Sequence, residues 1–468
     1  MLDKNQAADV FAKLKKHSSA DELEILFYST NNALTRFANN TIHQNVAEEN
    51  VVVSVRTAFG QRTARATTNK LDDESLKRVV QASESLAKVQ HPDPDLLTMP
   101  DPGHAGEGAR ATQPNLATQP SRYFAQTAAI SPEQRADTVK KMIAVAEKNK
   151  LTTAGIFSNS DSVEGIFNSR GLETWHTQTS SEVSITMLAA DSSGWQKANS
   201  PDIANLDPVK LADTAARKAI ESAKPREIPA GKYTVILEPA AVLDMVGFMF
   251  YDFGGTAILD ERSFLNNRGG TKLFGENIAI WDDVGHPLQS GSAFDGEGVS
   301  KQKVQLVEDG VINRLVYARG TAERMKKSDY KDKVGPIAAT GHGFPLPNEM
   351  GEAPMNIVFG APDKPQSIDQ MIASTEKGVL VTRLWYIREV DPYEKILTGM
   401  TRDGTFYVEN GKVQGGVRNF RFNESLIHML SNVLAMGTPI RASGEESFDM
   451  VVPAMKVADF NFTEVTKF

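Results

Sequence analysis

Two short turn motifs in the second half of the chain restrict its fold more than any other feature of the sequence. Asp-Gly stands inside "VEDGVI" and Asn-Gly inside "VENGKV", each between apolar runs. Such dipeptides favour two-residue hairpins, because both central residues readily adopt positive φ. Strand-like runs surround them at 233–237, 303–307, 311–317, 355–359, 378–386, 404–409 and 417–422, and helical patterns interrupt these at 240–251, 320–326, 367–374 and 424–436. The sequence therefore predicts an antiparallel, β-rich C-terminal domain over residues 231–468.

The first 230 residues contain one pattern twice. A helical period over 5–16 is followed by strand-like runs at 23–28, 34–43, 51–58 and 62–66, with a turn expected at 48–50, and then by a helix over 76–86. A second set of strand-like runs, at 152–157, 162–168, 173–176 and 182–189, precedes a helix over 208–223. The segments "VVVSVRTAFGQRTARAT" and "EVSITMLAADSSGWQKAN" align between the two. We expect an α+β protein with duplicated hairpin-plus-helix halves, residues 1–90 and 127–230.

The segment between the two halves, residues 91–126, is rich in Pro, Gly, Ala and Thr and has neither helical nor strand period. We interpret it as a surface linker. His91 and His104 lie within it, too far apart in such a segment to form a convincing metal-binding pair.

The composition excludes several kinds of function. The chain has no cysteine, so disulfides, thiolate nucleophiles and Cys-ligated metals are absent, and only His, Asp and Glu remain as metal ligands. A net charge of −8 gives no general attraction to nucleic acid. No run approaches the roughly 18 apolar residues of a membrane span. With no secretory signal at the N-terminus, we expect a cytoplasmic protein that binds neither membrane nor nucleic acid.

Five motifs in a fixed order carry a resemblance to a known family. They are "LTRFANNTIHQ", "SAFDGEGVSKQKVQLVEDGVINRLVYARGTA", "ATGHG", "GVLVTRL" and "LTGMTRDGTFYVENGKVQGGVRNFRFNES". Together they span nearly the whole chain, which resembles the TldD/PmbA (TldD/TldE) metallopeptidases. The resemblance implies a two-domain α+β fold, pairing of two related subunits around an enclosed cavity, and zinc-dependent cleavage of unstructured peptides.

The zinc motif of the TldD-type subunit resembles His-Glu-x-x-x-His on a helix after a Pro-led strand end, completed by a later cysteine. Here that place reads "LEPAAVLDMVGFMFYDFGG", and the slots fall at or beside Gly247, Phe248 and Asp252. Glycine and phenylalanine supply no ligand and no general base, and one aspartate makes a poor zinc site. The chain thus looks like the TldE/PmbA-type subunit. We expect no metal and no catalytic residue in it, and a core helix in which Asp244 and Asp252 cap or face solvent.

Three other residues are candidates for binding. His342 in "ATGHGF" has glycines on both sides, which permit close approach of a ligand, although a plain turn is the commoner explanation. Asp295 and Glu297 in "FDGEGV" would face one side of an extended chain and could bind a cation or an amine. An acidic turn explains them equally simply.

A second group of candidates comes from the strand and hairpin near residue 400. Thr398, Thr401 and Arg402 could present hydroxyls and a guanidinium to a peptide carboxylate or carbonyl, although a structural turn explains the glycines around them. Arg383 and Tyr386 lie on the preceding strand-like run with Trp385, where an extended peptide could add. A buried sheet face would also explain Trp385.

These inferences favour a cavity-forming subunit that pairs with a zinc-bearing TldD-type partner and helps enclose unstructured peptides. Two alternatives stay open. One is a metal-free homodimer that binds peptides or modulates another protein, in keeping with the family's older label as a modulator of DNA gyrase. The other is a peptidase whose metal is held by residues distant in the sequence.

Overall fold

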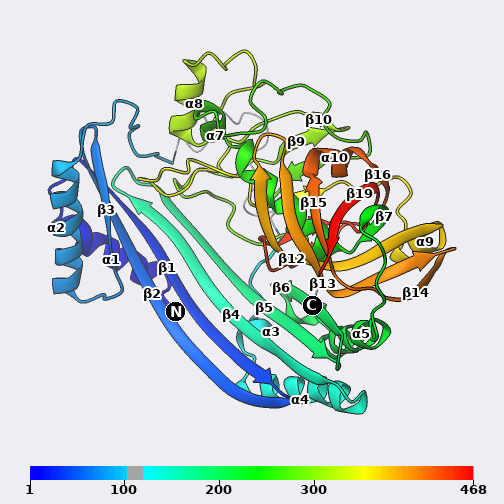
Figure 1. The fold of residues 1–468 in the computed structure, drawn as a ribbon. Coiled ribbons are helices and arrows are strands. Elements are labelled where there is room, and N and C mark those ends of the chain that lie inside the picture. The colour runs from blue at the N-terminus through cyan, green and yellow to red at the C-terminus, as the bar shows by residue number, and fades with distance from the viewer. Residues whose placement is uncertain (103–119, 467–468) are drawn as a thin grey trace.

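The computed structural model describes residues 1–102 and 120–466, and Figure 1 shows their arrangement. Helices account for 24% and strands for 39% of the chain, and most strand pairs are antiparallel, which confirms the α+β class. Residues 103–119 of the predicted linker, with His104, lie outside the described residues. No helix within them is long and apolar enough to cross a membrane.

The N-terminal part is one six-stranded antiparallel sheet in the order β3-β2-β1-β4-β5-β6. Its first half comprises α1 (Lys4–His17), β1 (Glu22–Ala38), β2 (Thr41–Phe59), β3 (Arg62–Thr68) and α2 (Asp73–Val89). After α3 (Ala125–Ala128), the second half comprises α4 (Pro132–Lys148), β4 (Thr152–Asn168), β5 (Glu173–Leu188), β6 (Ser193–Ser200), the 3-10 turn η3 (Ile203–Asn205) and α5 (Pro208–Glu221). The duplicated order of elements is therefore present, with α4 as an addition to the predicted elements.

The register of the strands shows that the two halves are related by a local two-fold axis. β1 pairs with β4 in the middle of the sheet, where Asn31 lies opposite Asp161. On the outer strands Asn31 also pairs with Glu49, and Asp161 pairs with Thr179. One row thus runs Glu49, Asn31, Asp161, Thr179, and the axis passes between its two central residues.

The turn expected at 48–50 was wrong, because the chain turns at Asn39 and Asn40 instead. Both asparagines have positive φ, 49° and 58°, and they form the two-residue connection between β1 and β2. Asparagine is one of the few side chains that tolerate this conformation. The polar stretch around residue 48 is exposed strand, so its polarity reflects solvent on both sides rather than a turn.

Each half buries its own apolar core beneath a pair of helices. Leu14 of α1 and Leu76 and Val80 of α2 pack on β1 and β2, whereas α4 and α5 pack on the other end of the sheet. The helix starts are defined locally, since Asp3 and Ser131 each form a capping box with a Gln three residues later. In Figure 1 the two helix pairs lie at opposite ends of the long curved strands.

The C-terminal part contains two further sheets and the largest core. The first sheet has the order β10-β9-β8-β11-β18-β17, and the second β12-β7-β19-β15-β13-β14, with an added β12–β13 pairing. That pairing closes β7, β12, β13, β15 and β19 into a five-stranded ring. The strands of the whole C-terminal part are β7 (Gly231–Leu237), β8 (Ile280–Asp282), β9 (Val304–Glu308), β10 (Val311–Ile312), β11 (Ile357–Phe359), β12 (Lys377–Asp391), β13 (Ile396–Glu409), β14 (Lys412–Gly416), β15 (Phe420–Ser425), β16 (Val433–Met436), β17 (Ile440–Ala442), β18 (Met450–Val452) and β19 (Met455–Val465).

Both hairpin signals are confirmed. Asp309-Gly310 joins β9 to β10 and Asn410-Gly411 joins β13 to β14, all four residues with positive φ. The run at 311–317 is strand only at Val311–Ile312. The helical segments are α6 (Pro239–Val246), the 3-10 turn η4 (Gly247–Phe253), α7 (Gly255–Leu259), α8 (Arg319–Lys326), α9 (Ile368–Ala373) and α10 (Leu426–Ser431).

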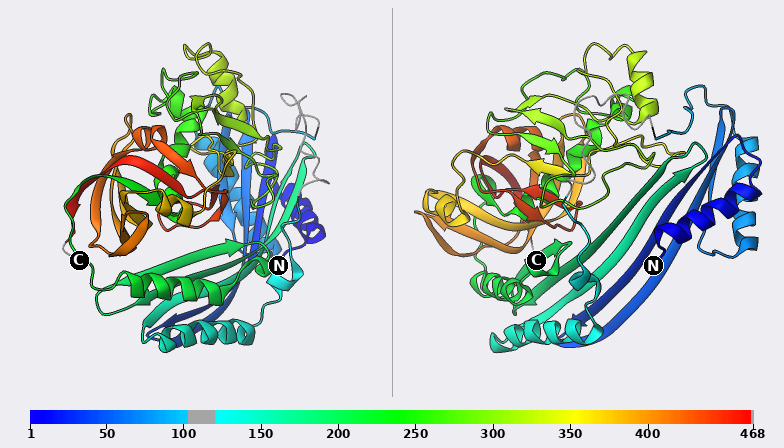
Figure 2. Two further views of the ribbon diagram at one scale, coloured as in Figure 1. Left: turned by 90° about the vertical axis from the view of Figure 1, so that its right-hand side faces the viewer. Right: turned by 180° about the vertical axis from the view of Figure 1, so that it is seen from behind.

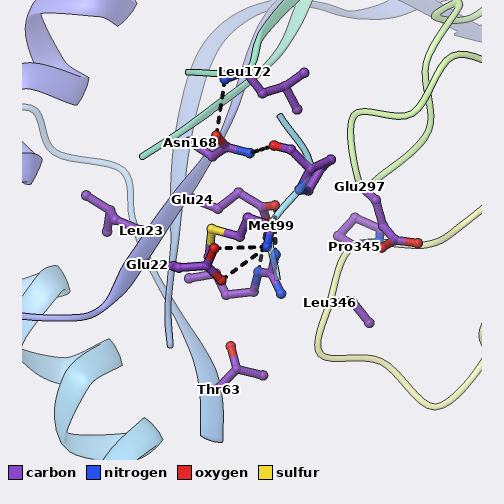
Figure 3. A network of polar contacts seen from close by, with 12 residues as sticks. Glu22, Leu23, Glu24, Thr63, Met99, Asn168, Leu172, Glu297, Pro345 and Leu346 are labelled. Carbon is purple, nitrogen blue, oxygen red and sulfur yellow. Dashed lines mark hydrogen bonds and ion pairs between the residues drawn. The ribbon is translucent and has the colours of Figure 1, made fainter. Parts of the chain in front are cut away.

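The two parts of the molecule meet at a buried polar junction (Figure 3). Glu24 of β1 is 1% exposed and accepts hydrogen bonds from Arg56 and Arg65 on β2 and β3. The Arg65 guanidinium also donates to the carbonyl of Leu346, at 2.7 Å. Glu297 lies across this junction from Glu24. The sheet end and the C-terminal loops are therefore tied by charge-assisted hydrogen bonds.

Candidate functional site

The residues at which the resemblance places the zinc-motif slots, Gly247, Phe248 and Asp252, lie just after α6, in η4. Helix α6 begins at Pro239 directly after β7, as proline at the first helical position favours. Gly247 is buried, and a Cβ at this position would collide with the side chain of Ser447. Phe248 is partly buried against the large core. Neither position offers a group that binds metal or moves a proton.

Asp252, the third slot residue, faces a lysine. Its Oδ2 is 2.5 Å from Lys395 Nζ, which is also 2.6 Å from Glu389 Oε1 and donates to the Phe248 carbonyl at 3.3 Å. The Lys395 side chain is 4% exposed. Burial raises the pKa of Asp252 to about 6, against the opposing effect of Lys395. The buried ammonium of Lys395 therefore lies against the Asp252 carboxylate, where a metal bound by this carboxylate would have to lie.

Zinc does not fit the slot residues as they are arranged. Two of the three lack a ligand atom, and the carboxylate of the third is held by the buried ammonium of Lys395. Within residues 1–102 and 120–466, no group of three or more His, Asp or Glu side chains is placed to hold a metal ion. The slot residues therefore support no catalytic step through a metal.

Asp244, on α6, is fully buried, so a solvent-facing role for it was wrong; the same holds for Asp252. Oδ1 of Asp244 accepts the backbone N–H groups of Glu445 and Glu446, both at 3.1 Å, while Oδ2 of Asp244 has no hydrogen-bond partner among the described residues. Burial raises the pKa of Asp244 to about 7. The carboxyl thus anchors the loop that fills the space beside Gly247.

The structure brings His342 and Asp295 together around a separate cavity of about 390 Å³, which Glu164 and Lys301 also line. Asp295 accepts three backbone N–H groups, including that of Gly343 at 2.8 Å. Burial, and secondly the neighbouring Glu297, raises its pKa to about 7. This is an acidic loop, buried rather than extended.

His342 and Glu297 are both engaged by the protein itself. Nε2 of His342 lies 3.0 Å from the buried Asp282 Oδ1, and Nδ1 lies 2.9 Å from Thr340 Oγ1. Glu297 accepts the N–H of Arg319 at 3.1 Å, and burial raises its pKa. Glu297 does not line the cavity. The close approach of His342 to Asp282 is an ion-pair contact without hydrogen-bond geometry, since Nε2 of His342 and Oδ1 of Asp282 have no hydrogen-bond partner among the described residues.

The residues near position 400 gather at a groove between β6 and the C-terminal ring. Two adjoining cavities of about 640 and 300 Å³ share lining residues, among them Ser193 and Asp403. Arg383 Nη1 is 2.7 Å from Asp403 Oδ2, and Ser193 donates to Asp403 Oδ1 at 2.7 Å. Arg383 also stacks over Trp195, which comes from the N-terminal sheet. The groove is therefore built by both parts of the chain.

The rim of this groove combines an aromatic ring with a guanidinium group. The Arg402 guanidinium lies 3.8 Å from the centre of the Trp385 ring, which is 37% exposed, so Trp385 is not on a buried sheet face. Arg383, Thr401 and Arg402 line the smaller cavity. Such a surface can hold a peptide carboxylate or carbonyl by hydrogen bonds and its side chains by stacking.

Two of the predicted residues lie outside the groove. Thr398 donates to the carbonyl of Phe422 within the ring of strands. Tyr386 is half-exposed and has φ of 57°, held by its N–H bond to Glu446. Trp195, Ser193, Asp403 and Lys395 were not predicted from the sequence as site residues. Lys395, in the turn before β13, and Asp403, within β13, both have positive φ, and lysine is not a residue that signals this conformation.

The comparisons with known proteins cover nearly the whole chain. Models of the PmbA/TldA metallopeptidases match residues 23–87 (domain 1), 126–223 (central domain) and 230–464 (C-terminal domain). Metalloprotease PmbA of Escherichia coli O157:H7 is 22% identical over 85% of this chain and 83% of its own length. The PmbA homologue of Haemophilus influenzae is 21% identical over 86% and 84%.

A solved structure shows the same fold. TldE from Thermococcus kodakarensis superposes with a TM-score of 0.83, covering 98% of this chain and 100% of its own, at 19% identity. The match of the C-terminal model alone spans half of the sequence. The chain belongs to the PmbA/TldD metallopeptidase family.

Proposed function

We propose that this chain is a cytoplasmic, cavity-forming subunit that carries no zinc of its own, pairs with a zinc-bearing TldD-type relative and helps enclose unstructured peptides. The observation that carries the proposal is the buried Lys395 ammonium, bound to Asp252, Glu389 and the Phe248 carbonyl in the motif slot. The Lys395 ammonium binds the carboxylates that could otherwise be metal ligands, and it occupies the space that a metal cation would need.

The division of labour follows from the residues present. Water activation needs a metal or a general base, and the slot supplies neither. The groove at Arg383, Trp385 and Arg402 supplies hydrogen-bond donors and a stacking surface. This chain would thus contribute binding and shape, while its partner performs the hydrolysis. The likeness to a TldE structure supports the same role.

Metal analysis and mixing test the proposal together. The chain purified alone without chelators should contain far less than one zinc per molecule and leave an unstructured peptide intact. Mixed with the family member from the same genome that carries the His-Glu-x-x-x-His motif, it should form a stable complex and change the rate of peptide cleavage.

One tightly held ion per chain, with chelator-sensitive activity of the chain alone, would instead favour a metal site built from distant residues. His342, Asp295 and Glu297 are then the first to substitute. Saturable peptide binding by a homodimer, with no effect of the relative, would favour the metal-free binding protein.

A further inference from the structure

The outer edge of β2 is open over much of its length. β3 pairs with β2 only from Val53 to Phe59, whereas β1 pairs with it from Thr41 to Ala58. Residues 41–52 therefore have a strand on one side only, and in the described chain no backbone group of theirs bonds outside that ladder. Figures 1 and 2 show this part of β2 along the outer border of the sheet.

The equivalent edge in the second half is covered. β6 pairs with β5 only from Ser181 to Leu188, which leaves residues 173–180 without a strand neighbour on the side away from β4. Here the N–H of Thr179 donates to the Arg122 carbonyl at 2.9 Å, and the Phe124 N–H donates to Thr179 Oγ1 at 3.1 Å. The Arg122 guanidinium then binds the carbonyls of Val284, His286 and Pro287.

The loop after this contact covers the same edge. The N–H of Gly291 donates to Gln178 Oε1 at 3.0 Å. An extended segment and a loop of the C-terminal part thus complete the second half of the sheet. The C-terminal part occurs once in the chain, while the half-sheet occurs twice.

The two-fold relation between the halves of the sheet identifies which residues of the open β2 edge correspond to the covered residues of β5. Glu49 and Thr179 hold equivalent places in the row through Asn31 and Asp161. Thr179 is 1% exposed, whereas Glu49 is exposed and held only by the terminal ammonium of Met1. Because successive residues of a strand point their N–H groups to opposite sides, the amides of Ala47, Glu49 and Val51 face outward, as that of Thr179 does.

The open edge is acidic and lacks the residues that most often prevent strand pairing. Residues 41–52 include Glu48, Glu49 and His43 and contain no Lys or Arg. Unpaired strand edges of this length are normally blocked by charged side chains, above all lysine, or by proline, or are covered, because they otherwise pair with other chains. Lysine and proline are absent from residues 41–52, and Glu48 and Glu49 are the acidic side chains there.

We propose that residues 41–52 of β2 form the edge on which an extended segment of the partner subunit docks, as the Arg122 segment docks on β5. The inference rests on the proposed function and adds to it the surface through which the two subunits pair. A partner with the same fold owns a C-terminal part and an equivalent segment, and this is what the first half lacks. Main-chain hydrogen bonds supply the contact, in the manner of strand addition.

Two substitutions at one exposed position test the docking edge. Ala47→Pro removes an outward N–H, and proline is tolerated at a strand edge where that N–H faces solvent. Ala47→Val keeps the N–H with a side chain of similar size. Titration against the zinc-bearing relative should show binding at least about tenfold weaker for the proline variant, and within about twofold of wild type for valine.

Hydrogen exchange on the wild-type chain gives a readout that does not depend on folding of a variant. The amides of Ala47, Glu49 and Val51 should exchange rapidly in the free chain and become protected in the complex. A complex that forms with these amides unprotected, or with both variants at wild-type affinity, overturns the docking edge and leaves the proposed function standing. No complex with wild-type chain overturns both.

Discussion

Buried carboxylates are handled in two ways in this molecule, and the contrast shows what each arrangement costs. At the junction of the sheet and the C-terminal part, Glu24 is buried between Arg56 and Arg65. Burial alone would raise its pKa, but the two guanidinium groups hold it below the ordinary value. In the C-terminal part, Asp244 on α6 and Asp295 in a loop are bound by backbone N–H groups, and burial raises the pKa of each to about 7.

Backbone N–H groups therefore compensate the charge of these two carboxylates less than burial disfavours it, whereas the paired arginines of Glu24 outweigh burial. The first region depends on charge for its stability, while the second is more stable with its carboxyls protonated. Four changes, from the largest expected effect to the smallest, test whether this distinction holds.

Glu24→Gln should lower the free energy of unfolding by about 3–5 kcal/mol, because it leaves the buried Arg56 and the partly buried Arg65 without their carboxylate partner. Urea unfolding at pH 7 measures the loss. The control is Glu173→Gln at an exposed position of β5, which should change the free energy of unfolding by less than about 0.5 kcal/mol. Equal effects of the two substitutions would remove the distinction between the regions.

Asp244→Asn should change the pH dependence of stability. The carboxyl in the unfolded chain ionises near the ordinary aspartate pKa of 3.8, whereas the folded one keeps its proton until about pH 7. This group's contribution is thus present at low pH and is lost as pH rises through 7, by at most about 4 kcal/mol. The variant should lack this decline, while the exposed Asp213→Asn should retain it. Parallel profiles for wild type and Asp244→Asn would contradict the assignment.

Lys395→Met and Asp252→Asn, alone and combined, measure the buried pair that fills the motif slot. The double-mutant cycle should give a coupling of about 1–3 kcal/mol, since removing either partner leaves the other buried. The exposed pair Lys326 and Glu323, treated in the same way, should give about 0.5 kcal/mol or less. Additivity at the buried pair would show that Lys395 does not hold Asp252.

Arg402→Ala should weaken binding of an unstructured peptide by roughly three- to tenfold and leave unfolding within about 0.5 kcal/mol of wild type, because its stacking on Trp385 is partly exposed. Quenching of tryptophan fluorescence follows the binding. Lys327→Ala, a distant exposed charge, serves as control. Equal peptide affinity of the two variants would show that the groove does not bind the peptide.

The sequence predicted those features that depend on local rules. The Asp-Gly and Asn-Gly hairpins and the duplicated order of elements follow from φ preference and apolar period, whereas helix α4, which begins after Ser131, was not predicted. The turn at Asn39 and Asn40 shows where such rules mislead. The polar residues near 48 have the composition of a turn, and only the absence of a neighbouring strand among the described residues explains their exposure.

The candidate sites were less accessible, because their partners lie far away in the sequence. Lys395 meets Asp252 only because a hairpin of the closed ring passes the end of α6. Trp195 reaches Arg383 across the boundary between the two parts of the chain. The sequence named Arg383, Thr401 and Arg402, which share one cavity, yet it also grouped them with Thr398 and Tyr386, which lie elsewhere.

The contact between Gly247 and Ser447 has an evolutionary consequence. A histidine at 247 would displace the loop anchored by Asp244, a glutamate at 248 would leave the core, and a metal would still meet the ammonium of Lys395. Each single step toward a catalytic centre loses packing before it gains a ligand. Single substitutions are therefore an unfavourable route from this sequence to a metal site at residues 247–252.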